Sequence, residues 1–267
     1  METSTTHGES IIHTARCTLQ GIEANVDVKD KLEDLTRKTA TLYKLIRNYE
    51  NIHHEGISSD CEILNWTLPV VEDELNAAVW NLTSGFYKTA ATCLRGALEM
   101  GLAALYFQIL ENGNFNDGEY NQTFADWNRG VTATPSWQEM EPVLKQHANA
   151  KDFSVGLGYC PINEVGQYLE LLNQFAHNCS FSSTNGEGAN ILNMKSGASG
   201  HFSQEMFDRM YGAVNTTISI IASTWLTIYP QIIPELDGEL AEAVKSLFVL
   251  KPAQDAFEFA NQASQNM

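Results

Sequence analysis

The sequence has few basic residues. Among its 267 residues, 16 Lys and Arg stand against 33 Asp and Glu, which gives a formal net charge of −17. Phosphate backbones attract Lys and Arg, so this balance opposes non-specific binding to DNA or RNA. It is compatible with a local basic pocket, and with a basic partner.

Cysteine and long apolar runs are also scarce. The five cysteines (17, 61, 93, 160 and 179) are odd in number and form no CxxC pair, so a disulfide framework or zinc cluster is poorly supported. The N-terminus lacks a cationic segment before an apolar core, which argues against a secretory signal. Without a run of about 18 apolar residues, we expect no membrane span. These features favour a cytoplasmic protein with reduced cysteines.

Short motifs that hold cofactors or metals are missing. The sequence contains no GxxxxGK[ST], GxSxG, HExxH or paired-glycine fingerprint. His53, His54 and Glu55 are adjacent, but neighbouring residues point in different directions and no third ligand is spaced nearby. We expect neither a cofactor nor a metal.

Apolar residues recur at helical spacing along most of the chain. The longest such stretch covers residues 73–111, and Ser84-Gly85 interrupts it. This predicts a helical hairpin, or one long helix with a weak point at Gly85. Further helices are predicted over residues 28–50, 162–177, 203–229 and 235–249. No strand is predicted, so the fold class is all-α.

The helix predicted over residues 28–50 carries a narrow apolar seam with 3-4-3-4-3 spacing. Its members are Leu32, Leu35, Thr39, Leu42, Ile46 and Tyr49. The seam either packs on the chain's own core or forms a dimer contact, and three heptads are short for an independent coiled coil.

Two regions have weaker patterns. Residues 112–164 are predicted to be an insertion with little regular structure at first, then a short helix that Ser136 and Glu139 begin as a capping box. Trp127 and Trp137 are expected to anchor this insertion. Residues 251–267 are expected to form a polar tail. The chain then divides into an N-terminal helical extension (1–60), a helical domain (61–250) and that tail.

Two pairs of polar residues fall on apolar helices. Arg95 and Glu99 lie four residues apart, as do Asn173 and His177, so each pair projects from one side of its helix. If Arg95 and Glu99 face inward, they are a site candidate, because buried polar groups need partners. If they face outward, they form a weak surface pair. His177 either acts in proton transfer near neutral pH or caps a helix end, where a cation is favoured.

The segments LTSGFYKTAATCLRGALEMGLAALYF (82–107) and YLELLNQFAHNCSF (168–181) resemble the HEPN-like superfamily of bacterial helical domains. In that family a hairpin with a Gly-x-Tyr-like turn leads into a helix bearing Arg and Glu. A later helix carries Arg-x(4–6)-His, often with Asn, Asp or His directly after the arginine. The resemblance covers mainly residues 73–111 and 165–229, about two fifths of the chain. It implies a HEPN-like helical bundle with a long inserted loop region and additional terminal helices.

Many HEPN-like proteins are metal-independent ribonucleases of antiphage defence or toxin–antitoxin systems, and act as dimers. The resemblance implies that His177 would assist proton transfer from the 2′-hydroxyl at the scissile phosphate, and that Asn173 matches the polar residue after the family's arginine. Leu172 then occupies the arginine position. A leucine supplies no positive charge to a phosphate, and Arg95 is the substitute that a neighbouring helix offers.

Three functions remain open. The first is a component of a bacterial antiphage defence or toxin–antitoxin system with degenerate or regulatory rather than robust nuclease function. The second is an active metal-independent RNA endonuclease that uses His177, with Asn173, Arg95 and Glu99 around it. The third is a non-enzymatic scaffold for protein–protein contact. Expected partners are another protein or a second copy of the chain, with RNA as a further candidate and no membrane.

Overall fold

The computed structural model describes residues 25–49, 60–112, 117–176 and 203–264, together with residues 20, 22 and 23. Throughout these residues every regular element is a helix. The prediction of an all-α fold is therefore confirmed.

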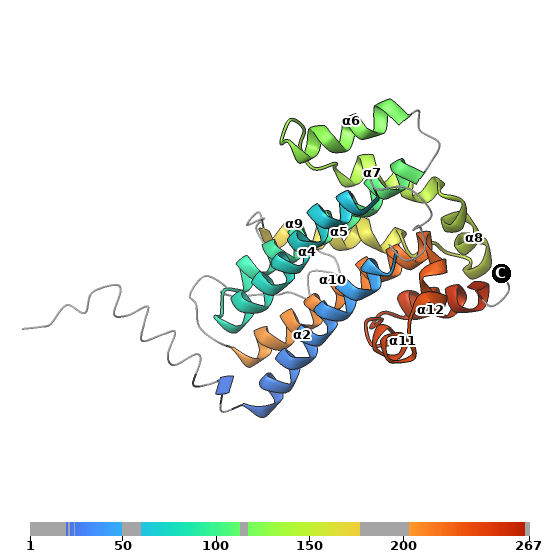
Figure 1. The fold of residues 1–267 in the computed structure, drawn as a ribbon. Helices are drawn as coiled ribbons and strands as arrows, with labels where there is room; N and C mark the ends of the chain where they lie inside the picture. The colour runs from blue at the N-terminus through green and yellow to red at the C-terminus, as the bar shows by residue number, and fades with distance from the viewer. Residues whose placement is uncertain are drawn as a thin grey trace, which may run out of the picture.

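The hairpin predicted around Gly85 lies at the centre of the fold (Figure 1). It consists of α4 (Asp60–Thr83) and α5 (Tyr87–Asn112), and Gly85 joins them with a φ of 73°. Glycine adopts this left-handed conformation readily because it has no Cβ. Phe86 follows Leu82 at helical spacing but is 46% exposed, because it lies in the turn between the two helices. Pro69 does not stop α4, which begins well before residue 73.

Helix α5 is the central helix of the bundle. It packs against α4, α7 (Trp137–Gln146), α9 (Asn163–Ala176) and α10 (Gln204–Ile228). By length and composition alone it could cross a membrane, with a mean hydropathy of 1.2, but 67% of that apolar window is buried inside the fold. Its apolar character is that of a core helix covered by its neighbours.

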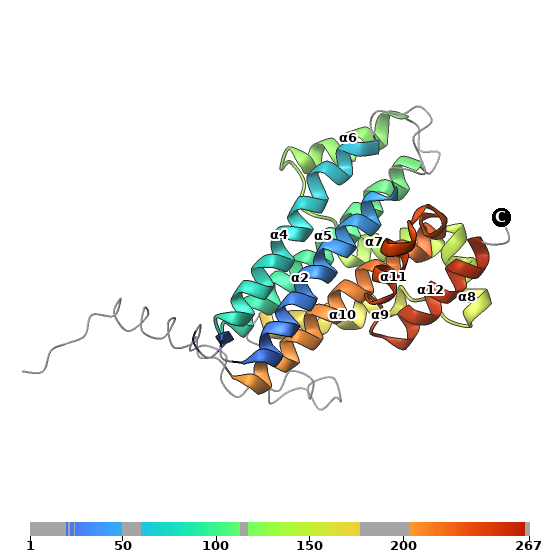
Figure 2. The ribbon, with the colours of Figure 1, turned by 60° about the horizontal axis from the view of Figure 1, so that its bottom comes forward.

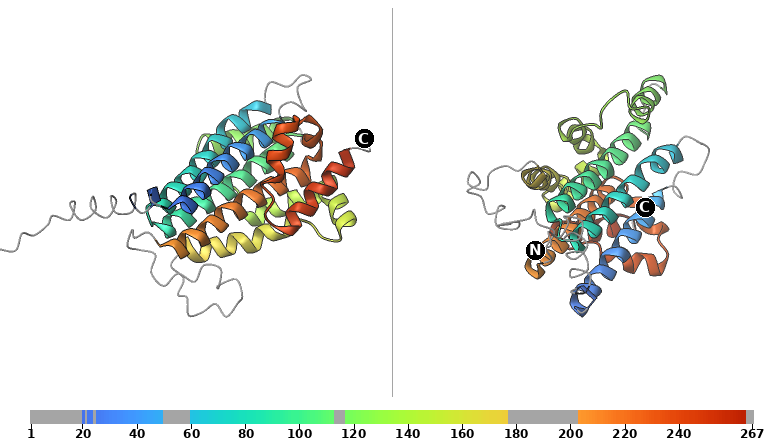
Figure 3. Two further views of the ribbon diagram at one scale, coloured as in Figure 1. Left: turned by 90° about the horizontal axis from the view of Figure 1, so that it is seen from below. Right: turned by 90° about the vertical axis from the view of Figure 1, so that its left-hand side faces the viewer.

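Helices α2 (Val26–Arg47) and α10 run side by side in the same direction (Figure 3). Polar contacts join residues whose numbers differ by a constant 177. Lys31 contacts Asp208, Asp34 contacts Tyr211, and Lys38 contacts Asn215. Because each contact follows the previous one by about a helical turn on both helices, the polar ladder fixes the register of this parallel pair.

The apolar seam of α2 is part of the chain's own core. The helix packs against α4, α10 and α11 (Gly238–Lys245), and Leu32 packs at the edge of the core. The fully or largely buried seam residues are Leu35, Thr39, Leu42, Ile46 and Tyr49. The alternative of a dimer contact through this seam is therefore wrong.

The insertion is more regular than its composition predicts. Helix α6 (Asp117–Asn128) and helix α8 (Ala148–Leu157) were not expected, whereas α7 begins with the predicted capping box of Ser136 and Glu139. Trp127 anchors α6, because its ring lies 5.2 Å from that of Phe107 on α5. Tertiary burial of aromatic rings thus stabilises a helix whose Gly, Asn and Asp residues disfavour one.

The C-terminal segment also differs from expectation. Pro230 follows the end of α10, in agreement with the predicted range 203–229, and opens a 3₁₀ turn, η3 (Pro230–Glu235). Residues 251–267, expected to form a polar tail, include α12 (Lys251–Ser264), which packs against α8, α10 and η3 (Figure 2). Its buried side chains are Ala253, Ala256, Phe257 and Ala260.

Candidate functional site

Arg95 and Glu99 form an ion pair along α5. The Arg95 Nε donates to Glu99 Oε1 at 2.8 Å, and the two side chains are 28% and 36% exposed. The pair therefore lies at the border between core and solvent. An i,i+4 pair with this exposure contributes little to stability, about 0.3–0.5 kcal/mol.

Asn173 lies on α9, which packs directly on α5. The structure therefore brings the helix of Asn173 beside the helix of Arg95 and Glu99. Asn173 is partly buried, and its Oδ1 is buried without a hydrogen-bond donor among the described residues. A buried acceptor of this kind costs about 1–3 kcal/mol until water or a bound donor satisfies it. His177 lies outside the described residues, so its pairing with Asn173 stays a prediction.

Leu172 occupies the position at which the resemblance places an arginine. Its side chain is fully buried, on the same face as Val165 and Leu169. This face of α9 packs into the hydrophobic core. A side chain at position 172 therefore contacts other apolar groups and cannot reach a phosphate in solvent.

A polar contact between α4 and α5 was missed by the sequence patterns. A Cβ built on Gly96 would lie 3.0 Å from the carboxyl carbon of Glu74, so the glycine leaves room for this carboxylate. The pKa of Cys93 is raised to about 11, mainly by burial. The negative charge of Glu74 and a hydrogen bond to Glu74 raise it further. The thiol is protonated at neutral pH and is a poor nucleophile. Glu74 and Cys93 are 19 positions apart in the sequence, so only the packing of α4 against α5 reveals that they interact.

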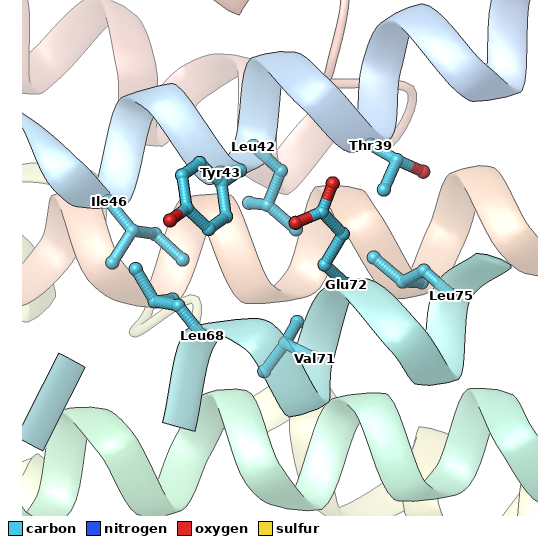
Figure 4. A pocket seen from close by; sticks show the side chains of 8 residues that line it. All are labelled: Thr39, Leu42, Tyr43, Ile46, Leu68, Val71, Glu72 and Leu75. Carbon is cyan, nitrogen blue, oxygen red and sulfur yellow. The ribbon is translucent and has the colours of Figure 1, made fainter. Parts of the chain in front are cut away.

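A narrow gap separates α2 from α4 on the side of Glu72 (Figure 4). Its volume is about 10 Å³, room for one water molecule. Figure 4 shows the Glu72 side chain rising from α4 toward α2 among mainly apolar neighbours. The gap is too small for a substrate.

A wider hollow of about 290 Å³ lies where α7, α8 and the start of α9 meet. Lys145, Lys151 and Cys160 are among its lining residues. The Lys145 Nζ contacts Glu141 Oε1 at 2.6 Å, which offsets its charge. Burial raises the pKa of Cys160, while a backbone hydrogen bond from Ile162 and the charge of Lys145 oppose this shift. The hollow thus holds a protonated thiol, the paired Lys145 and the exposed Lys151, and a protonated thiol is a poor nucleophile.

The first turn of α9 also borders this hollow. Its backbone N–H groups already have acceptors, because Asn163 N donates to Cys160 O at 2.9 Å and Glu164 N donates to Pro161 O at 3.2 Å. An anion would have to displace these bonds, so the helix start is not a ready phosphate site.

No group of three or more His, Cys, Asp or Glu side chains that could hold a metal ion occurs in the part of the chain that the structure describes. Comparison of the chain with protein-family models, curated proteins and solved structures finds no match.

Proposed function

We propose that the chain is a regulatory component of a bacterial antiphage defence or toxin–antitoxin system, built on a HEPN-like helical bundle and lacking robust nuclease activity. The resemblance of residues 82–107 and 168–181 supports the family. An all-helical bundle in which α5 packs on α9 agrees with it.

The burial of Leu172 carries the non-nucleolytic part of this proposal. Metal-independent cleavage of RNA needs a positive charge on the phosphate, because negative charge develops there in the transition state. Leu172 is fully buried, and the neighbouring Arg95 already donates to Glu99. The net charge of −17 further weakens attraction for a polyanion.

A second candidate is an active endonuclease with Arg95 as the phosphate-binding cation. The partial exposure of Arg95 favours it, as does the contact of α5 with the helix that leads to His177. This alternative requires Arg95 to exchange Glu99 for phosphate, and requires His177 to transfer a proton.

Cleavage of RNA by the purified full chain tests the proposal. Total cellular RNA is incubated with the wild type, His177→Ala and Arg95→Ala, with a chelator present to remove metal-dependent contaminants. Arg129→Ala is the matched control, because Arg129 is an exposed arginine on the far insertion, paired with Asp126. We expect no cleavage by any of the four proteins.

The proposal fails if the wild type cleaves RNA while His177→Ala does not. Loss of cleavage in Arg95→Ala but not in Arg129→Ala would further assign the missing cation to Arg95. Cleavage that is equal in all four proteins would indicate a contaminating ribonuclease, and a repeat after further purification would then give the expected absence.

A further inference from the structure

The outward face of α4 carries two exposed tryptophans in line. Trp66 is 54% exposed, Trp80 is 69% exposed, and Val70 between them is 38% exposed. With Asp73 and Ala77 these residues recur at spacings of four and three, so they lie along one face of the helix. We call these five residues, Trp66, Val70, Asp73, Ala77 and Trp80, the α4 stripe.

The stripe is not needed to attach α4 to the bundle. The opposite face of the helix packs against α2, α5 and α10, and its buried residues are Ile63, Leu64, Leu68, Val71, Leu75, Ala78 and Leu82. Figure 2 shows α4 at the outer edge of the bundle. The two tryptophans together leave about 200–300 Å² of ring surface in water. Tryptophan is, with tyrosine and arginine, enriched among the residues that dominate binding energy at interfaces.

Charge indicates the sign of the partner. Helix α4 contains no Lys, Arg or His. Its Glu72 lines the gap toward α2 and its Glu74 lies against Gly96 of α5, so Asp73 is the carboxylate that the stripe presents. Asp73 is exposed at the centre of the stripe. Arg47 of α2 borders this surface: it donates to Asn65 Oδ1 at 2.8 Å and lies over the ring of Tyr43, which holds it at the seam between α2 and α4. The stripe therefore offers two aromatic faces and a carboxylate to a cation.

A second copy of the chain fits the stripe poorly. Trp66 and Trp80 each lie seven residues from Asp73. Two stripes that pair about a twofold axis, parallel or antiparallel, would place the two Asp73 carboxylates opposite each other. Like charges opposed in a closing interface cost energy. A partner with Lys or Arg at that point gains instead.

We propose that the α4 stripe is a docking surface for a basic amphipathic helix of a partner protein. The tryptophans lie 14 residues apart, about 21 Å at the rise of an α-helix, so the partner helix needs about four turns. Its apolar face covers Trp66, Val70 and Trp80, and its Lys or Arg side chains meet Asp73 and the tryptophan rings. The proposal stands on α4 alone, so RNA cleavage by the chain would remove the proposed function and leave the α4 stripe unaffected.

A designed peptide tests the proposal on the full chain. The probe is a fluorescein-labelled helical peptide of about five turns, with leucines at the spacing of the stripe and lysines beside them. The control peptide has glutamate in place of every lysine. Titration with the wild type, followed by fluorescence anisotropy, is expected to show saturable binding of the lysine peptide, with affinity at least about tenfold higher than that of the glutamate peptide.

Three variants locate the binding site. Trp66→Ala/Trp80→Ala is expected to weaken binding of the lysine peptide about tenfold or more. Asp73→Lys is expected to reverse the preference toward the glutamate peptide. Val131→Ala/Val155→Ala is the matched control, because these valines are 68% and 86% exposed outside α4, and its affinity should equal that of the wild type. Circular dichroism melts confirm that each variant is folded.

Three results would overturn the proposal. The first is failure of the lysine peptide to bind the wild type. The second is equal binding to the wild type and to Trp66→Ala/Trp80→Ala. The third comes from light scattering after size exclusion: a dimer of the wild type that the double tryptophan variant loses would assign the surface to a second copy of the chain.

Discussion

Lys38 carries a positive charge in the buried interface between α2 and α10. Its side chain is 9% exposed, and its Nζ lies 2.6 Å from Asn215 Oδ1 and 2.9 Å from Asp34 Oδ2. Asp34 also accepts hydrogen bonds from Tyr211 at 2.7 Å and from Arg37 at 2.6 Å. Replacing Lys38 with methionine keeps the volume and removes the charge, so it tests the polar ladder rather than the packing.

The cost of Lys38→Met follows from the groups left behind. Removing one partner of a buried ion pair typically costs about 3–5 kcal/mol. Asp34 keeps Tyr211 and Arg37, which lowers that figure, while Asn215 Oδ1 loses its donor at about 1–3 kcal/mol. We expect the free energy of unfolding, measured by urea denaturation at pH 7, to fall by about 2–3 kcal/mol. Lys31→Met is the matched control: Lys31 is 25% exposed, and its loss should cost under about 1 kcal/mol.

The pH dependence gives this prediction a second test. Burial raises the pKa of Asp34, but hydrogen bonds from Tyr211, Lys38 and Arg37 outweigh it and hold the pKa below its ordinary 3.8. A depressed carboxyl pKa adds stability above the unfolded value, and this stability is lost as pH falls through the folded value. The difference between wild type and Lys38→Met should therefore be complete above about pH 5 and shrink below about pH 4.

A double-mutant cycle decides whether Lys38 and Asn215 act as a pair. Lys38→Met/Asn215→Leu replaces both polar partners, so neither remains buried and unsatisfied. The loss in the double variant should be smaller than the sum of the two single losses by about 1 kcal/mol or more. Additive losses, or a loss below about 0.5 kcal/mol for Lys38→Met, would refute the assigned role of the ladder.

Further predictions concern the backbone and the thiol. Gly212 lies within α10, and a Cβ at this position would meet no atom within 4 Å, so Gly212→Ala should stabilise the protein by about 0.5–1 kcal/mol in urea denaturation. Gly85 has a φ of 73°, so Gly85→Ala should destabilise the protein by about 1 kcal/mol in the same measurement. Equal signs for these two variants would contradict the conformation assigned to Gly85. Glu74→Gln removes a negative charge that raises the pKa of Cys93, so alkylation of Cys93 at pH 8, followed by peptide mass spectrometry, should become faster. An unchanged rate would mean that Glu74 does not act on the thiol.

The most periodic helices could be predicted closely from sequence. The predicted range 203–229 compares with α10 at Gln204–Ile228, and 162–177 compares with α9 at Asn163–Ala176. Large apolar side chains at helical spacing mark these segments, and Ser203 and Pro230 mark the ends of α10. Gly85 similarly marks the turn between α4 and α5.

Helices held by small or scattered side chains could not be predicted. Helix α12 is buried largely through alanines, which give a weak periodic signal. Helix α6 depends on Phe124 and Trp127 meeting Phe107, a contact between segments that no local pattern joins. Tertiary packing overrides local propensity at both places.

The polar contacts of the candidate site and of the polar ladder between α2 and α10 were likewise predictable only in part. The Arg95–Glu99 pair follows from i,i+4 spacing, and the structure adds only its partial exposure. The burial of Lys38 and its contact with Asn215 depend on two helices 177 residues apart in the sequence lying parallel. A lysine in an amphipathic helix is usually expected at the surface, so this contact needed the structure.

Binding of RNA is the measurement that tests the central claim most directly, because a site whose arginine position is a buried leucine lacks the cation that would hold the phosphate before any cleavage step. A labelled single-stranded RNA is titrated with the purified full chain, with a chelator present and at physiological salt, and fluorescence anisotropy is followed. The burial of Leu172 and the pairing of Arg95 with Glu99 predict no saturable binding. Saturable binding that falls with salt and is lost in Arg95→Ala would contradict the proposal of a non-nucleolytic regulator.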